Sequence, residues 1–111
     1  MEFIQIEKLA RILESKIKYQ FSGKLWRDNS DNGWYFITVP DHFSKEIRSN
    51  LQWQEEGWGR MKATAVIKDL NWNTSIWYDT KAKNYILPVK SEIRKKLSLQ
   101  ENDLLSISIL V

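Results

Sequence analysis

The chain has 111 residues, a length that suits one domain with a single apolar core. It contains no cysteine, which excludes disulfides, thiolate metal sites and cysteine nucleophiles and favours a reducing, cytoplasmic location. The formal net charge is +3, and the whole surplus lies late in the chain, because residues 1–55 carry eight Lys or Arg against eight Asp or Glu while residues 56–111 carry nine against six. The charged N-terminal stretch and the lack of a long apolar run argue against a signal peptide and a membrane span.

An amphipathic helix is predicted over about residues 3–16, within an N-terminal segment 1–18 that precedes the main domain. Apolar side chains recur there at spacings of three and four, as on one face of a helix: Phe3, Ile6, Ala10, Leu13 and Ile17. Residues 19–111 are predicted to form a single, mainly β domain.

Two strands open this domain. They are predicted over residues 19–27 and 34–39, which are rich in the aromatic and β-branched side chains that suit a pleated surface. The polar run 28–33 separates them and ends in Gly33, which tolerates the positive φ of a turn. Pro40 ends the second strand.

A helix is predicted next, with Asp41 as its N-cap. Phe43, Ile47 and Leu51 are spaced so that they share one helical face, which we expect to be buried. Residues 52–59 then form a connector.

The second part of the chain repeats strands and a helix. Residues 61–68 and 72–78 are predicted to form a hairpin around the polar link 69–71, and the loop 79–84 leads to a strand at residues 85–89.

A short helix over residues 91–97 follows, with Ser91 as N-cap and Ile93 and Leu97 facing inward. Asn102 is the natural positive-φ position before a final alternating strand over residues 105–111.

A shift of fifty residues aligns residues 35–47 with residues 85–97, which indicates two similar halves at about 19–67 and 68–111. It matches identical residues at three positions, Tyr35 with Tyr85, Val39 with Val89 and Lys45 with Lys95. FSGKLW ending at Trp26 also resembles WNTSIW ending at Trp77, with one extra loop residue. Two units that cannot bury their apolar faces alone would pack around a pseudo-twofold axis, so the repeat predicts a closed or nearly closed barrel of about six or seven strands with two short helices.

The segment VKSEIRKKLSLQENDLLSI resembles the swapped-hairpin unit of the AbrB and MazE class. The matching positions are Glu92, Ile93, Arg94, Leu97, Leu99 and Asp103. This chain has Lys90 where the class usually has proline, Asn102 where it has the turn glycine, and Ser44 at the arginine position of the first copy.

Over about residues 19–111 the chain is similar to the bacterial domain-of-unknown-function family nineteen-oh-five. The features that carry the resemblance occur in the same order: Gly33-Trp34-Tyr35-Phe36, Gly57-Trp58-Gly59-Arg60, Trp72-Asn73-Thr74-Ser75, Tyr85-Ile86-Leu87-Pro88 and Arg94. The resemblance implies a double-split β-barrel, and it implies no activity.

No constellation of side chains predicts catalysis. His42 is the only histidine, which excludes a multi-histidine metal site, and we expect it on the surface. Glu55 and Glu56 lie together on the connector, where carboxylates are usually solvated. Ser75 has no neighbouring base, and no glycine-rich phosphate loop occurs. We therefore expect no catalytic, metal or cofactor site, and an enzyme is the least favoured hypothesis.

The six tryptophans divide into two groups. Trp26, Trp34, Trp72 and Trp77 fall in predicted strands, where we expect them to fill the core. Trp53 and Trp58 fall on the connector, where either could be exposed and could stack on a ligand or partner.

Two functional hypotheses remain. The first is a protein- or small-ligand-binding module whose recognition edge is built from the connector and the loops. The second is a DNA-binding or antitoxin-like regulator that uses the basic C-terminal part. Neither involves a membrane, and either could act as a monomer or a homodimer.

The candidate contact residues are the same for both hypotheses: Arg60, Lys90, Arg94, Lys95, Lys96 and Trp58. Two alternatives stay open. The lysines could form an ordinary solvated helix, and Arg94 could be structural, with its guanidinium paired to a carboxylate such as Asp103.

Overall fold

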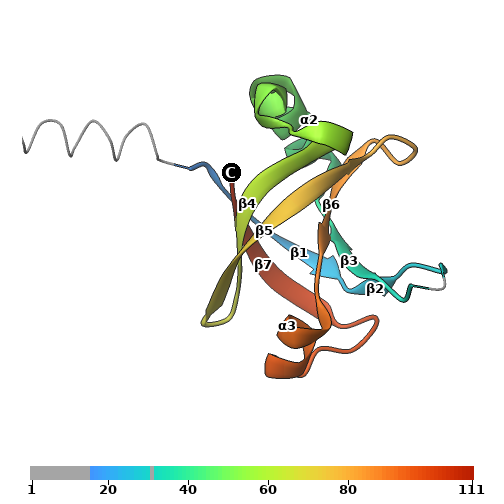
Figure 1. Cartoon of the computed structure of the whole chain (residues 1–111). Coiled ribbons are helices and arrows are strands. Elements are labelled where there is room, and N and C mark those ends of the chain that lie inside the picture. Colours follow the sequence, from blue (N-terminus) through green and yellow to red (C-terminus); the bar gives the residue numbers. More distant parts are fainter. Residues whose placement is uncertain (1–15, 31) are drawn as a thin grey trace, which may run out of the picture.

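Seven antiparallel strands form one curled sheet, a half-barrel, in a computed structural model that describes residues 16–30 and 32–111 (Figure 1). The strands are β1 (Lys18–Lys24), β2 (Trp26–Arg27), β3 (Tyr35–Thr38), β4 (Arg60–Ile67), β5 (Leu70–Asp79), β6 (Asn84–Pro88) and β7 (Leu104–Leu110). Their order across the sheet is β1-β7-β4-β5-β6-β3-β2. The predicted mainly β fold is confirmed, and the predicted N-terminal helix falls almost entirely outside the described residues.

Within residues 16–30 and 32–111, two α-helices lie at opposite ends of the curled sheet (Figure 1). They are α2 (Asp41–Leu51), which continues into the 3-10 turns η1 (Gln52–Gln54) and η2 (Gly57–Gly59), and α3 (Ser91–Lys96). As predicted, α2 buries Ile47 and Leu51, and α3 buries Ile93. Phe43 was also expected to be buried but is half-buried, as is Leu97 just after α3, and both pack against the core. Among the described residues, no helix is long and apolar enough to cross a membrane.

Both predicted helix caps are wrong by one residue. Pro40 and Lys90 occupy the N-cap positions with extended backbones, at ψ 151° and 157°. Asp41 and Ser91 are therefore the first helical residues. The Asp41 carboxylate is not free to cap α2, because it accepts a hydrogen bond of 2.5 Å from the Asn84 side chain.

The predicted strand over residues 19–27 is interrupted at Leu25. The Leu25 N–H donates to the Asp103 carbonyl at 3.0 Å, and the Leu25 carbonyl accepts from the Asn102 N–H at 2.7 Å. These bonds tie Leu25 to the turn before β7 instead of to a neighbouring strand. Because only this residue separates β1 from β2, the chain passes at Leu25 from one edge strand of the sheet to the other.

The predicted hairpin of β4 and β5 is present, but its turn is shorter than the sequence suggested. Ile67 pairs with Leu70 and Val66 with Asn71, so the turn consists of residues 68–69. Lys68 adopts the positive φ there, at 53°. The tight turn lets two of the three expected link residues join β5.

The predicted turn positions elsewhere are confirmed. Gly33 has a φ of 63° before β3, and Asn102 has a φ of 74° before β7.

The main core lies inside the curl, where side chains from six strands and both helices meet. Its largest fully buried members are Tyr85, Leu25, Ile37, Ile47, Met61, Ile67, Ile76, Leu87, Ile107, Ile109, Val39 and Val89. The same alternation that buries these side chains directs their neighbours to the outer face of the sheet.

Two reciprocal backbone hydrogen bonds flank the pairing of β3 with β6. The Val39 N–H donates to the Tyr85 carbonyl at 2.9 Å, and the Val89 N–H donates to the Tyr35 carbonyl at 2.8 Å. Residues 37 and 87 face each other between these bonds. The fifty-residue shift relates these two hydrogen bonds to each other, because it matches Val39 with Val89 and Tyr35 with Tyr85.

Candidate binding groove

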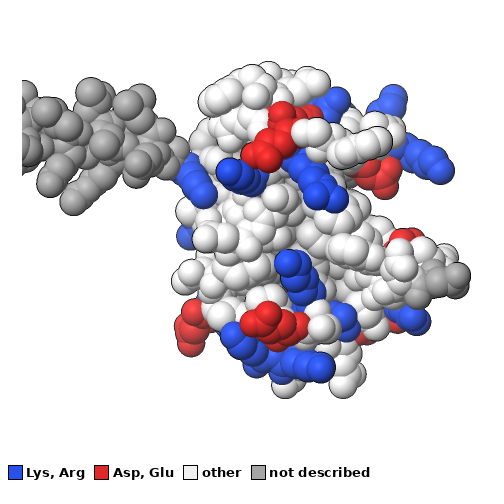
Figure 2. Space-filling model, viewed as in Figure 1, with Lys and Arg blue, Asp and Glu red and all other residues white. Residues whose placement is uncertain are grey.

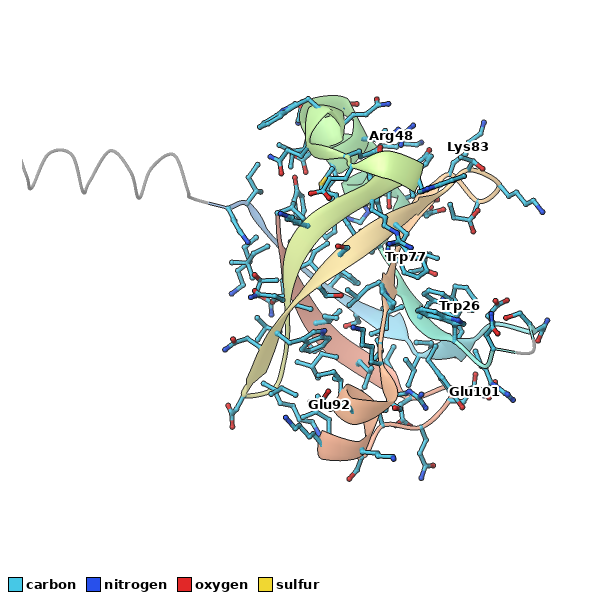
Figure 3. The ribbon with its side chains drawn as sticks, in the orientation of Figure 1. Trp26, Arg48, Trp77, Lys83, Glu92 and Glu101 are labelled. Carbon is cyan, nitrogen blue, oxygen red and sulfur yellow. The ribbon has the colours of Figure 1, made fainter. Side chains whose placement is uncertain are left out.

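A second apolar cluster lies on the outer face of the sheet, separate from the main core. It consists of Trp26, Trp34, Phe36 and Trp77, which we call the outer cluster; two of its members are labelled in Figure 3. Ring centroids lie 5.0 Å apart for Trp26 and Phe36, and 5.6 Å apart for Phe36 and Trp77. The Trp26 indole N–H also donates to the Thr38 hydroxyl at 2.9 Å.

The prediction that four tryptophans fill the core is wrong. Trp26 and Trp77 are half-buried on the outer face, because their neighbours Leu25 and Ile76 point into the core. Trp34 precedes β3 and is 40% exposed. Only Trp72 packs against the main core, and it too is half-buried.

A basic groove of about 670 Å³ lies beside the outer cluster. It runs over β4 and β5 toward the start of α3, and Figure 2 shows Lys and Arg side chains on this side of the molecule around a mostly uncharged centre. Its lining contains Lys16, Trp34, Arg60, Lys62, Asn73, Ser75, Trp77 and Lys90, and within the described residues it contains no Asp or Glu.

The positive charge of the basic groove is mostly uncompensated. The Arg60 guanidinium lies 5.0 Å from the centre of the Trp77 ring. Neither Arg60 nor Lys90 forms an ion pair with any residue in the described ranges. Lys62 meets Glu56 at 3.7 Å, but both side chains are exposed, so water screens the pair.

Arg94 is held by contacts that the sequence did not predict. Its guanidinium lies 3.8 Å from the centre of the Tyr35 ring, and its Nε donates to the Val89 carbonyl at 3.2 Å. The proposed partner Asp103 instead accepts a hydrogen bond of 2.8 Å from the Gln100 N–H. The expected pairing with Asp103 is therefore wrong, although Arg94 does pack against the fold.

The remaining candidate residues lie away from the basic groove. Lys95 and Lys96 are exposed on α3, and Lys96 meets Glu92 at 3.6 Å. Trp58 is 95% exposed on η2, with a φ of 69°. It lines a separate hollow of about 250 Å³ near α2. Of the six predicted contact residues, only Arg60 and Lys90 share the groove.

Sequence reasoning missed Lys16, Lys62, Trp34 and Trp77 as groove residues. A signal for part of this set was present, because Arg60 directly precedes the predicted strand 61–68. The structure extends this strand to Arg60, which places it two residues from Lys62 on the same face. Their pairing opposite Trp77 and Ser75 follows from the register of β4 and β5, which sequence patterns leave open.

A second charged cluster joins α2 to β5 and β6. Arg48 donates to the Glu55 carboxylate at 2.7 Å and lies 3.8 Å from the centre of the Tyr78 ring. Burial and the nearby Glu55 carboxylate raise the pKa of Tyr85 to about 12. This cluster connects structural elements, and in the described ranges no group of three His, Cys, Asp or Glu side chains could hold a metal ion.

A family comparison covers most of the domain. The family described as a domain of unknown function, DUF1905, matches residues 21–109. The chain belongs to the DUF1905 family. Comparison with curated proteins gives no significant match. The predicted relation of this DUF1905 domain to AbrB and MazE units stays a prediction.

Proposed function

We propose that this DUF1905 domain is a non-enzymatic binding module whose basic groove accepts an anionic ligand that carries a planar ring. The observation that supports this most directly is the composition of the groove, which combines four Lys or Arg side chains and two tryptophans with no described carboxylate. Its volume lies within the range of ordinary small-molecule sites.

The anionic character follows from the charges. Arg60 is the first residue of β4 and Lys90 directly precedes α3. Although they are far apart in the sequence, both line the same concavity. Cations gathered in a concave site focus their field and attract anions. An arginine also forms two parallel hydrogen bonds to a phosphate or carboxylate, which makes Arg60 the principal anchor.

The planar character follows from the tryptophans. The Trp34 ring is nearly parallel to the Phe36 ring, at an interplanar angle of 10°, and 40% of its surface is exposed. A ring held against one aromatic neighbour can offer exposed surface to another flat group. Asn73 and Ser75 add polar groups that can orient a bound ligand.

Calorimetric titration with three probes tests this proposal. Phenyl phosphate joins an anion to a ring, whereas inorganic phosphate and phenol each carry one part. We expect phenyl phosphate to bind about tenfold more tightly than either part, because both halves of the site contribute. Equal affinity for inorganic phosphate, or release of phenol during incubation, would contradict the proposal.

Two variants locate the binding. Arg60→Gln removes the anchor and should weaken phenyl phosphate about tenfold, the cost of one charge-assisted contact. Lys96→Gln removes the same unit of charge from the exposed face of α3, outside the groove, and should leave the affinity unchanged. Equal losses in both variants would point to general charge instead of the groove.

We also propose that the domain contains an internal duplication, with halves at about 19–67 and 68–111. The reciprocal hydrogen bonds between Val39 and Tyr85 and between Val89 and Tyr35 support it. Separately, we propose a cytoplasmic location, because a chain without cysteine suits a reducing compartment.

A further inference from the structure

Resting on the proposed function of the basic groove, we infer that its ligand is a short single-stranded stretch of nucleic acid. The inference depends on how the groove continues beyond Trp34 and Lys90. The anion is then a phosphodiester chain, and Arg94 is part of the binding surface.

The basic groove does not end at the outer cluster. A second concavity of about 340 Å³ is lined by Trp34 and Lys90, which also line the groove, and by Tyr35 and Arg94. Two shared lining residues make the concavities neighbours, and together they form a continuous path from β4 to α3. A compact small molecule would fill only one of them, whereas an extended ligand can occupy both.

Cationic side chains are distributed along this path. Arg60 lies at the β4 end, Lys90 where the concavities meet and Arg94 at the α3 end. Within residues 16–30 and 32–111, neither lining contains an acidic side chain. A spaced series of cations fits the regularly spaced charges of a phosphodiester backbone better than it fits a single anion.

Arg94 can contribute although it is anchored. Its Nε is bonded to the Val89 carbonyl, and its guanidinium is stacked on Tyr35. These contacts fix the orientation of the group, and an arginine has four further N–H donors that can reach a phosphate. A pre-oriented guanidinium loses little conformational freedom when it binds.

Trp34 supplies a stacking surface at the junction of the two concavities. Its exposed indole can carry an unstacked base, while the neighbouring cations hold the phosphates on either side. Aromatic platforms inside a positive groove are the usual means by which proteins bind single strands without reading sequence. Bases inside a duplex are already stacked on each other, so a duplex cannot use this platform.

The experiment titrates the full chain with thymidine monophosphate and with oligothymidylates of two and four nucleotides, followed by tryptophan fluorescence and calorimetry. The tetranucleotide should bind at least about tenfold more tightly than the mononucleotide, because it reaches Lys90 and Arg94 as well as Arg60. Three phosphate contacts predict a slope of about −2 for log affinity against log salt concentration.

Arg94→Gln separates the extended ligand from a small one. This variant should weaken tetranucleotide binding about tenfold and leave mononucleotide binding unchanged, since only the longer ligand reaches α3. Lys95→Gln is the matched control, because it removes an exposed positive charge one residue away and should change neither affinity. Circular dichroism and thermal unfolding of both variants establish that the comparison is made on folded protein.

Three results would overturn the inference. Equal affinities for the mononucleotide and the tetranucleotide would retain the proposed function and reject the extended path. A duplex of the same strand length that binds as tightly as the single strand would reject the role of Trp34. Tight binding of phenyl phosphate with no binding of any nucleotide would assign the groove to another class of anion. If none of these anions binds, the proposed function itself is rejected.

Discussion

The two halves of the proposed duplication build the same strand in different ways. In residues 19–67 the chain breaks at Leu25 into β1 and β2, whereas in residues 68–111 β5 continues without interruption for ten residues. The buried side chain is matched in both, since Leu25 and Ile76 are fully buried at equivalent positions. Core-facing side chains are thus alike in the two parts, while the backbone around them differs.

Positions 44 and 94 show a similar difference in side chains, because different side chains there donate to matching backbone carbonyls. The Ser44 hydroxyl donates to the Val39 carbonyl at 3.0 Å, and Arg94 Nε donates to the equivalent Val89 carbonyl at 3.2 Å. Ser44 also accepts from the Tyr85 N–H at 3.0 Å, and it is fully buried. The Val39 carbonyl is therefore bound by a small hydroxyl and by the Asn84 amide, which donates to it at 3.1 Å, whereas the Val89 carbonyl is bound by a guanidinium, which places positive charge at one end of the sheet.

The largest effects are expected where β3 pairs with β6, because Ile37 and Leu87 are matched by the fifty-residue shift and also pair with each other. Ile37→Ala and Leu87→Ala each remove a fully buried side chain, and each should lower the free energy of unfolding by about 2–5 kcal/mol. Urea denaturation measures both values. Leu104→Ala is the control at a side chain that is 70% exposed, where the change should be small. Losses that differ several-fold between Ile37 and Leu87 would argue against equivalent environments.

Ser44→Ala tests the hydrogen bonds at the first of the paired positions. The change leaves the buried Tyr85 N–H without its hydroxyl partner and leaves the Val39 carbonyl with the Asn84 amide as its side-chain donor, and we expect a loss of about 1–3 kcal/mol in the free energy of unfolding. Chemical denaturation of Ser44→Ala and Ser44→Cys separates lost bonding from lost volume, because cysteine fills the space with a weaker hydrogen-bonding group. A neutral alanine variant would show that Ser44 and Arg94 do not serve the same role.

The next smaller effect on stability is expected at Gly23, which the match of FSGKLW with WNTSIW aligns with Thr74. A Cβ at Gly23 would lie 2.8 Å from the Ile37 Cγ2, where β1 passes close to β3. Gly23→Ala should therefore cost about 1–2 kcal/mol through overpacking. Thr74→Ala removes atoms at a half-buried site and should cost less. Thermal unfolding compares the two, and a stabilising alanine at Gly23 would contradict the close approach.

The smallest effect is expected in the pH dependence, at the onset of Tyr85 ionisation. The pKa of Tyr85 is raised to about 12, whereas tyrosine in an unfolded chain ionises near pH 10. Stability from this group is present below about pH 10 and falls as the pH rises toward 12, because the unfolded chain loses the proton first. Urea unfolding at about pH 9 and 10.5 should show this fall in the native chain and in Tyr35→Phe, and a weaker fall in Tyr85→Phe.

The sequence by itself determined the local elements of this protein and its family. Alternating and helical spacings identify the strands, the buried helix faces and the turns at Gly33 and Asn102, because these depend on the φ, ψ and side-chain periodicity of neighbouring residues. The tertiary structure alone decided that Trp26 and Trp77 face outward and that Arg60, Lys90 and Arg94 lie along one path. Those positions depend on strand order and register, which bring distant residues together across the sheet. The spacing of apolar residues within one segment does not determine either of them.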